Sequence, residues 1–324
     1  MKDDITARRA SSARRHLWPW LLAAILCAGT PLSVAAGPVT AESAAVESGR
    51  HSEPERPLVV ATIHPLALII HQLAGDMLDT VGLLAPAQDP HHASLSPSQR
   101  RLLGRADLVV WVGPTFESFM ARPVASLPED RVLTWLAGDK NGHHHDSGGH
   151  SATAGVHGAD PHIWLDIDAT RGFSRQLVAR LAARYPDLAL PLAQRLVDFE
   201  RRLDASAALL AGRLQPLQSA AFIAEHAAYG PFVDQFALRL VGSLSDSSGV
   251  ALGARNLWQL KNHRDIACVV VERPPGSKLA RQLARGLDVP VVVIDPLGLE
   301  VGLEQGYSAL LETVAEGFER CLGE

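Results

Sequence analysis

The chain has 324 residues, of which 47% are hydrophobic, 5% aromatic and 20% charged, and its formal charge at pH 7 is −5. This length allows two domains with cores of their own, and the composition is that of a globular protein. A modestly acidic chain without a basic stripe is a poor nucleic-acid binder, so no nucleic-acid partner is expected.

Residues 1–36 are predicted to be a signal peptide. Four arginines precede an apolar run at 17–28, and Val34-Ala35-Ala36 offers the small residues of a cleavage site. The run is too short to span a bilayer comfortably. We therefore predict export to the periplasm and a mature chain of charge −8, because residues 1–36 carry a net +3. Residues 37–56 are small, polar and aperiodic, which predicts a disordered leader.

Residues 57–168 are predicted to form a first lobe of alternating strands and helices. Strands are expected at the apolar runs 58–63, 80–84, 106–113 and 132–133. Helices are expected at 66–74 and from a Ser96 or Ser98 cap to about 104, and residues 116–120 are expected to begin another helix. This alternation predicts a parallel sheet that is covered on both faces.

Residues 169–218 are predicted to be a helical linker. Pro186 and Pro191 are expected to interrupt it, and 192–217 then supplies a long amphipathic run. About 20 helical residues span roughly 30 Å, which is enough to bridge two lobes. A rigid link of this kind favours local loop movements over a wide hinge.

Residues 219–324 repeat the alternating pattern in a second lobe. Strands are expected at 220–224, 238–242, 267–271 and 289–294, and helices at 232–236, 254–261, 279–286 and 306–322. The predicted fold class is therefore α/β, with two lobes, each a parallel β-sheet flanked by helices, joined by one long linking helix.

Two of the three cysteines remain after removal of the signal peptide, which contains Cys27. Cys268 and Cys321 form an even pair in an oxidising compartment, so we predict a disulfide between them. The alternative is two separate buried thiols.

Residues 139–160 form a loop with too little apolar surface to pack. Its histidines are His143, His144, His145, His150 and His157. Imidazole is the commonest side-chain metal ligand, so this loop is predicted to gather zinc-like ions loosely. The alternative is a polar insertion whose histidines do nothing specific.

Further candidate ligands follow predicted strands, where ligands of parallel sheets bind. They are His91 or His92, and His162, His226 and Asp295. Three imidazoles and one carboxylate make a closed tetrahedral zinc site. Each residue alone is more often a hydrogen-bonding loop residue, so the prediction depends on their conjunction with the His-rich loop.

From Leu58 to the C-terminus the chain resembles the zinc-specific substrate-binding proteins of bacterial ABC importers, the periplasmic ZnuA-like group. The resemblance is carried by Asp89-Pro-His91 with Ser96-Pro-Ser98, by ADLVVWVG at 106–113, by the His-rich insertion, by His162-Ile-Trp164, by His226-Ala-Ala-Tyr229-Gly, by Glu272-Arg-Pro274, by Asp295-Pro-Leu-Gly298 and by the two cysteines.

The resemblance implies His91, His162 and His226 as zinc ligands, Asp295 as the fourth, and His92 as a neighbour. Pro90 stands where some relatives have an acidic residue that approaches the metal, which strengthens the case for Asp295. A third imidazole, where manganese-binding relatives have a carboxylate, favours zinc. The loop after Gly242 lacks the Glu and Pro that relatives often have there, so the resemblance implies nothing about interlobe contacts near it.

The implied function is high-affinity zinc capture in the periplasm. A soluble, monomeric mature protein would deliver zinc, its transported ligand, to an ABC permease and through it to a cytoplasmic ATPase. The alternatives are a metal-binding adhesin or a periplasmic metallochaperone on the same scaffold, and lastly a secreted zinc hydrolase. A hydrolase needs an open coordination position and a fixed general base, and the sequence has no His-Glu-x-x-His motif. We therefore predict a binding protein and not an enzyme.

Overall fold

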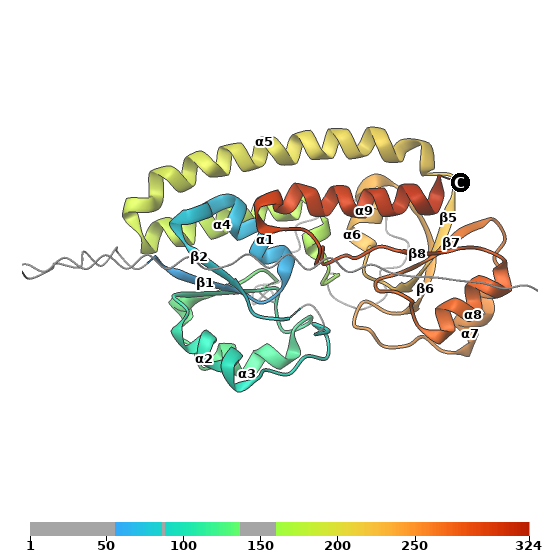
Figure 1. Ribbon diagram of the computed structural model, residues 1–324, viewed down its shortest axis with the longest axis horizontal. Coiled ribbons are helices and arrows are strands. Elements are labelled where there is room, and N and C mark those ends of the chain that lie inside the picture. Colours follow the sequence, from blue (N-terminus) through green and yellow to red (C-terminus); the bar gives the residue numbers. More distant parts are fainter. Residues whose placement is uncertain (1–55, 86–87, 137–159, 324) are drawn as a thin grey trace, which may run out of the picture. The chain divides into compact units, whose positions relative to one another are not determined.

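The computed structural model describes residues 56–85, 88–136 and 160–323. The predicted signal peptide, the leader up to residue 55 and the histidines of the His-rich loop lie outside these ranges and stay predictions. In the described part of the chain, two four-stranded parallel sheets form two lobes (Figure 1). No helix of this part is both long and apolar enough to cross a membrane.

The first lobe is built on a sheet with the strand order β2-β1-β3-β4. Its strands are β1 (Leu58–Ala61), β2 (Asp79–Gly82), β3 (Leu108–Trp111) and β4 (Val132–Thr134), and all pair in parallel. The helices are α1 (His64–Ala74), α2 (Pro97–Arg105) and α3 (Ala121–Ala125). All four expected strands are confirmed, because β-branched runs are buried in the sheet.

Two local details differ from or refine the predicted helices. Ser96, and not Ser98, caps α2, since its hydroxyl accepts the Gln99 N–H while the Gln99 side chain accepts the Ser96 N–H. The helix expected to begin within 116–120 does begin there, but only at residue 118. The Glu117 carboxylate accepts the Val112 N–H at 2.7 Å and holds residues 113–117 in a turn, so the helical region begins only at a 3₁₀ turn, Ser118–Met120, before α3.

Two helices lead from the first lobe to the second. They are α4 (Ile167–Arg184) and the 26-residue α5 (Ala189–Leu214), which spans about 39 Å at 1.5 Å per residue. Pro186 separates them as predicted. Pro191 does not interrupt α5, because it lies in the first turn, where a backbone N–H has no helical partner.

The second lobe has the same strand order as the first, β6-β5-β7-β8. Its strands are β5 (Ala221–His226), β6 (Arg239–Ser245), β7 (Ile266–Val271) and β8 (Val291–Val293), all in parallel. Its helices are α6 (Gly230–Phe236), α7 (Ala254–Lys261), α8 (Lys278–Leu287) and α9 (Gly306–Leu322). The predicted fold class is therefore confirmed.

A continuous apolar core connects the lobes. Helix α9 packs against α5 and against α1 of the first lobe, and Figure 1 shows α5 and α9 running side by side. Cys321 of α9 forms a disulfide with Cys268 of β7, with their Cα atoms 5.5 Å apart. The predicted disulfide is confirmed and the alternative of two free thiols is wrong.

The disulfide closes a loop of 53 residues and should stabilise the fold by restricting the unfolded chain. We expect the double variant Cys268→Ser and Cys321→Ser to lose about 2–4 kcal/mol of unfolding free energy, measured by urea denaturation. Zinc stoichiometry is expected to stay unchanged. With reductant the wild type should approach the variant, and equal stability of the wild type and the variant without reductant would contradict the prediction.

Candidate metal centre

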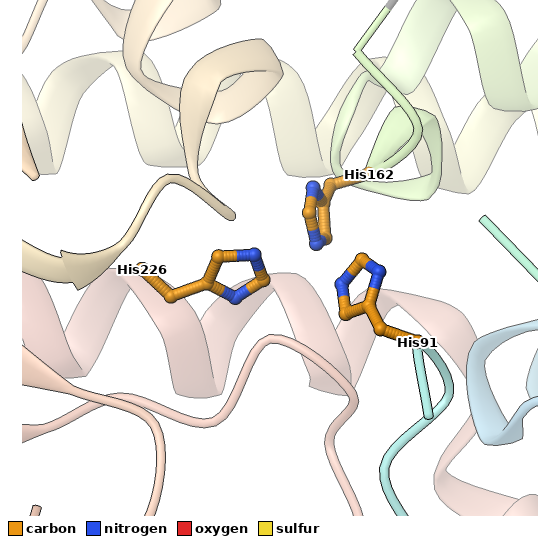
Figure 2. A group of neighbouring side chains, drawn as sticks. All are labelled: His91, His162 and His226. Carbon is orange, nitrogen blue, oxygen red and sulfur yellow. The ribbon is translucent and has the colours of Figure 1, made fainter. Parts of the chain in front are cut away.

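The residues that follow the strands of both sheets enclose one cavity of about 370 Å³. His91 lies in the loop after β2, His162 lies just before α4, and His226 is the last residue of β5. Figure 2 shows the three imidazole rings, from three separate segments, pointing toward one another. Parallel sheets present ligand sites at these carboxyl ends, as expected.

The three imidazoles lie at metal-binding spacing. One nitrogen from each ring lies within 4.8 Å of the others, and no other group of three described His, Cys, Asp or Glu side chains meets this spacing. The ring centroids are 4.9 Å apart for His162 and His226, 5.1 Å for His91 and His226, and 5.6 Å for His91 and His162. His162 is 2% exposed and His226 is 9% exposed.

Carboxylates fix the orientation of two of these rings. Nδ1 of His162 lies 2.9 Å from Oδ1 of Asp160, and Nδ1 of His226 lies 2.6 Å from Oε1 of Glu272. A carboxylate accepts hydrogen bonds, so Nδ1 carries the proton and Nε2 keeps its lone pair. Metal-binding histidines are held by carboxylates in the same manner.

The Nε2 atom of His226 is buried without a hydrogen-bond partner among the described residues. Such a buried polar atom is costly unless something binds it. A divalent cation between the three rings would satisfy this nitrogen. The residues present therefore fit a zinc ion held by imidazole nitrogens.

Comparison with known proteins agrees with this geometry. The family model of zinc-uptake complex component A, periplasmic (ZnuA), matches residues 59–321. The chain belongs to the ZnuA family. This is a family of substrate-binding proteins and not of enzymes, so the hydrolase alternative is set aside.

The curated relatives of the ZnuA family match most of the chain. The high-affinity zinc uptake system protein ZnuA of Haemophilus ducreyi is 29% identical over 287 residues, which cover 82% of this chain and 93% of the relative. The protein of the same name from Yersinia pestis is 27% identical over 289 residues, which cover 82% and 91%.

Solved structures share the fold. A crystal structure of ZnuA has a TM-score of 0.68 at 21% identity and covers 82% of this chain and 99% of its own. A zinc-bound ZnuA with residues 138–173 deleted has a TM-score of 0.69 at 22% identity and covers 82% and 98%. The periplasmic zinc-binding protein TroA of Treponema pallidum has a TM-score of 0.68 at 20% identity and covers 82% and 99%.

An aromatic wall supports the three rings of this ZnuA-family chain. The Phe116 ring packs edge-on against His91, with the centroids 4.6 Å apart, and against Trp164 at 5.0 Å. Trp164 in turn packs against His162 at 5.2 Å. This wall excludes water from one side of the cavity, which strengthens the electrostatic interactions inside it.

The imidazoles have unequal proton affinities. Burial, with the neighbouring His162 and His226, lowers the pKa of His91 to about 4. Burial also opposes the charged form of His226, but its hydrogen bond to Glu272 outweighs this and raises the pKa above the usual value. Burial alone would raise the pKa of Glu272, yet the His226 contact lowers it. Protons therefore compete with a bound cation more strongly at His226 than at His91.

The predicted residues have different places in the structure. His92 points away from the cavity, with 67% of its side chain exposed, and its Nδ1 contacts Asp89. Asp295 lines the cavity, but its two oxygens accept the N–H groups of Leu297 at 2.8 Å and Leu299 at 2.7 Å. It does not belong to the group spaced within 4.8 Å, and its role as a ligand stays a prediction. The five histidines at 143–157 lie outside the described residues.

Three carboxylates that position the histidines, Asp89, Asp160 and Glu272, were not predicted from the sequence. Asp160 and Asp89 each precede a histidine in the same tripeptide, Asp-Pro-His, and in both the Oδ1 atom accepts the histidine N–H at 2.9 Å. This repeated tripeptide is a readable signal for Asx turns that position imidazoles. The contact of Glu272 with His226 joins residues 46 positions apart, and no local pattern indicates it.

Glu117 is a buried carboxyl that lies behind the aromatic wall. Its Oε1 atom has no partner among the described residues, and burial raises its pKa to about 7. The neutral carboxyl is therefore favoured in the folded state. Its stabilising contribution is fully present below the unfolded pKa of about 4.5 and is lost as the pH rises through 7.

We expect Glu117→Gln, which is neutral at every pH, to be more stable than the wild type at pH 8. The gain should be on the order of 3 kcal/mol and should shrink toward zero near pH 5. Urea unfolding at the two pH values measures it. Glu129→Gln, at an exposed carboxyl of the same lobe, is the control and should leave the unfolding free energy unchanged at both pH values. If Glu117→Gln gained as much stability at pH 5 as at pH 8, the gain would not come from the titration of Glu117 and the prediction would be wrong.

Glu272→Gln should weaken zinc binding near neutral pH by about 10–100-fold, because it removes the charge that orients His226. It should also flatten the rise of affinity with pH above about 6.5, since the pKa of His226 would fall. Competition with a chelating dye over a pH series measures both effects. Glu225→Gln is the matched control, because Glu225 lines the same cavity but accepts the Ser277 N–H. If Glu272→Gln kept the zinc affinity of the wild type and the same dependence on pH, Glu272 would not orient His226 for zinc binding.

Proposed function

We propose that this ZnuA-family protein captures zinc with high affinity in the periplasm and delivers it to an ABC permease driven by a cytoplasmic ATPase. The observation that carries the proposal is the convergence of three buried or half-buried imidazoles, two of them oriented by carboxylates. The family is periplasmic, and the relatives named above are high-affinity zinc uptake proteins. Both facts support capture and delivery.

In this proposal His91, His162 and His226 bind the ion, and Asp295 remains the predicted fourth ligand. Three imidazoles favour zinc over manganese, which prefers oxygen ligands. Zinc competes with a proton at His226, whose pKa is raised by Glu272, so capture is favoured as the pH rises. Glu272 and Asp160 stay in place during binding and keep the ligand nitrogens directed into the cavity.

The His-rich loop is proposed as an accessory that raises the local zinc concentration. Its five histidines, at 143, 144, 145, 150 and 157, suit loose and exchangeable binding. Its loss should reduce capture when zinc is scarce and leave the site between the lobes intact.

The adhesin and metallochaperone alternatives have less support. A laminin-binding adhesin of Streptococcus agalactiae shares the fold with a TM-score of 0.66, but at 17% identity this likeness concerns the fold alone. The family model and the curated relatives favour zinc uptake instead.

Titration of the purified mature chain with zinc tests the site. We expect His162→Ala and His226→Ala each to remove tight binding, because each deletes a ligand from a closed set. His92→Ala is the matched control from the same loop as His91 and should bind like the wild type, since its ring is exposed. Asp295→Asn should weaken binding less than the histidine variants, because both oxygens already accept backbone hydrogen bonds. Unchanged tight binding in both histidine variants would overturn the site.

A further inference from the structure

Phe116 contacts two of the three imidazoles of the metal centre. Its ring lies nearly perpendicular to those of His91 and His162, with the centroids 4.6 and 5.4 Å apart. Phe116 is 3% exposed, and it lines the same cavity as the histidines. The phenyl ring therefore closes the side of the cavity that lies along His91 and His162.

A tight turn after β3 fixes the position of this ring. The N–H groups of Phe116 and Glu117 donate to the Gly113 carbonyl at 3.2 and 2.9 Å. The Glu117 carboxylate in turn accepts the Val112 N–H at 2.7 Å. Gly113 has a φ of +145°, and a Cβ atom there would stand 2.9 Å from the Leu136 carbonyl oxygen, which favours glycine. These contacts leave Phe116 little freedom to move away from the imidazoles.

The oxygen atoms of the cavity wall are already engaged in the folded chain. The carboxylates that line the cavity are Asp89, Glu225, Glu272 and Asp295. Each of them accepts at least one hydrogen bond from a described residue. Additional oxygen ligands for a bound ion would therefore come mainly from water. The phenyl ring of Phe116 offers neither a ligand atom nor a hydrogen bond that could hold a water molecule.

We propose that Phe116 is a specificity-determining residue, which keeps the bound ion four-coordinate and thereby favours zinc over manganese. This inference rests on the proposed function. Zinc in closed protein sites takes four ligands in a tetrahedron, whereas manganese suits an octahedron of six oxygens. Three imidazoles and one further ligand complete the set for zinc. An octahedral ion needs water on several sides, and the phenyl ring occupies one of them.

This exclusion acts in addition to the chemical preference of the ligands. Imidazole nitrogens bind both ions and only bind zinc better, so the imidazole set alone gives a graded preference. A fixed apolar ring instead removes the coordination positions that the competing ion requires. The residues around a metal site set solvent access in this manner, and Phe116 is the one that contacts two ligand rings at once.

Variants of Phe116 in the full mature chain test this role. Phe116→Ala opens space for water beside the imidazoles, and Phe116→Val opens less space and disturbs the core less. Phe116→Leu keeps a large apolar side chain and should retain the selectivity of the wild type. Phe173→Ala is the matched control, because Phe173 is as deeply buried in the same apolar core but stacks on Trp135 at 4.2 Å instead of on an imidazole.

Two measurements separate metal selectivity from folding. Competitive titration gives the ratio of zinc affinity to manganese affinity. The visible spectrum of the cobalt-loaded protein reports the coordination number, because four-coordinate cobalt absorbs much more strongly than six-coordinate cobalt. We expect intense cobalt bands in the wild type, in Phe116→Leu and in the control. Phe116→Ala should show weaker bands and lose about tenfold of its preference for zinc over manganese, with Phe116→Val between the two.

The outcomes distinguish the role of Phe116 from the function on which it rests. A wild-type spectrum and a wild-type zinc preference in both Phe116→Ala and Phe116→Val would overturn the inference, and so would weak cobalt bands in the wild type. An equal loss of preference in Phe173→Ala would assign the effect to disturbed packing and would also overturn it. If the wild type did not bind zinc tightly, the proposed capture itself would be wrong.

Discussion

Three imidazoles whose ligand nitrogens lie within 4.8 Å of one another cannot all be protonated at low cost. The pKa of His91, lowered to about 4, expresses this repulsion together with burial. Asp160 and Glu272 place two negative charges behind the rings. A divalent cation at the centre balances these charges, whereas a proton on each ring would leave an excess of positive charge in a buried site. This charge balance explains why the cavity suits zinc more than it suits water or protons.

This charge balance requires that the imidazole rings keep their positions. The hydrogen bonds that hold the surrounding residues join the two lobes. The Trp164 indole N–H donates to the Pro296 carbonyl at 2.8 Å, and the Tyr307 hydroxyl donates to the Trp164 carbonyl at 2.5 Å. Helices α5 and α9 contribute to one apolar core shared by both lobes. Opening the lobes widely would break these buried hydrogen bonds and expose this core. Ligand exchange is therefore easier through loops than through a hinge.

Much of the fold could be predicted from the sequence, because β-branched runs and a long amphipathic segment are local signals. The eight strands and the long helix α5 follow from these signals, whereas the separation of α4 from α5 follows from Pro186 and the disulfide from an even pair of cysteines in an exported chain. The metal site was harder to predict, because an aspartate at a strand end can either bind a metal ion or fix a turn through its own hydrogen bonds. Asp89, Asp160 and Asp295 all stand in Asp-Pro-x tripeptides, and in each the Oδ1 atom accepts the N–H two residues on. The sequence predicts Asp295 as a fourth ligand, which stays a prediction, and the shared geometry shows that Asp295 also fixes a turn as the other two do.

The three imidazoles proposed as ligands come from three segments, and this division bears on how a bound ion would leave. Removing a single imidazole opens a three-ligand set, so movement of one segment is sufficient for exchange. His162 is the least movable of the three, since it is buried and its neighbour Trp164 is bonded to the opposite lobe. His91 lies in a loop that comes close to Gly249 of the second lobe, where an added Cβ atom would stand 4.0 Å from the His91 ring. A small displacement of these two loops would therefore move the His91 imidazole while the core and the disulfide stay undisturbed.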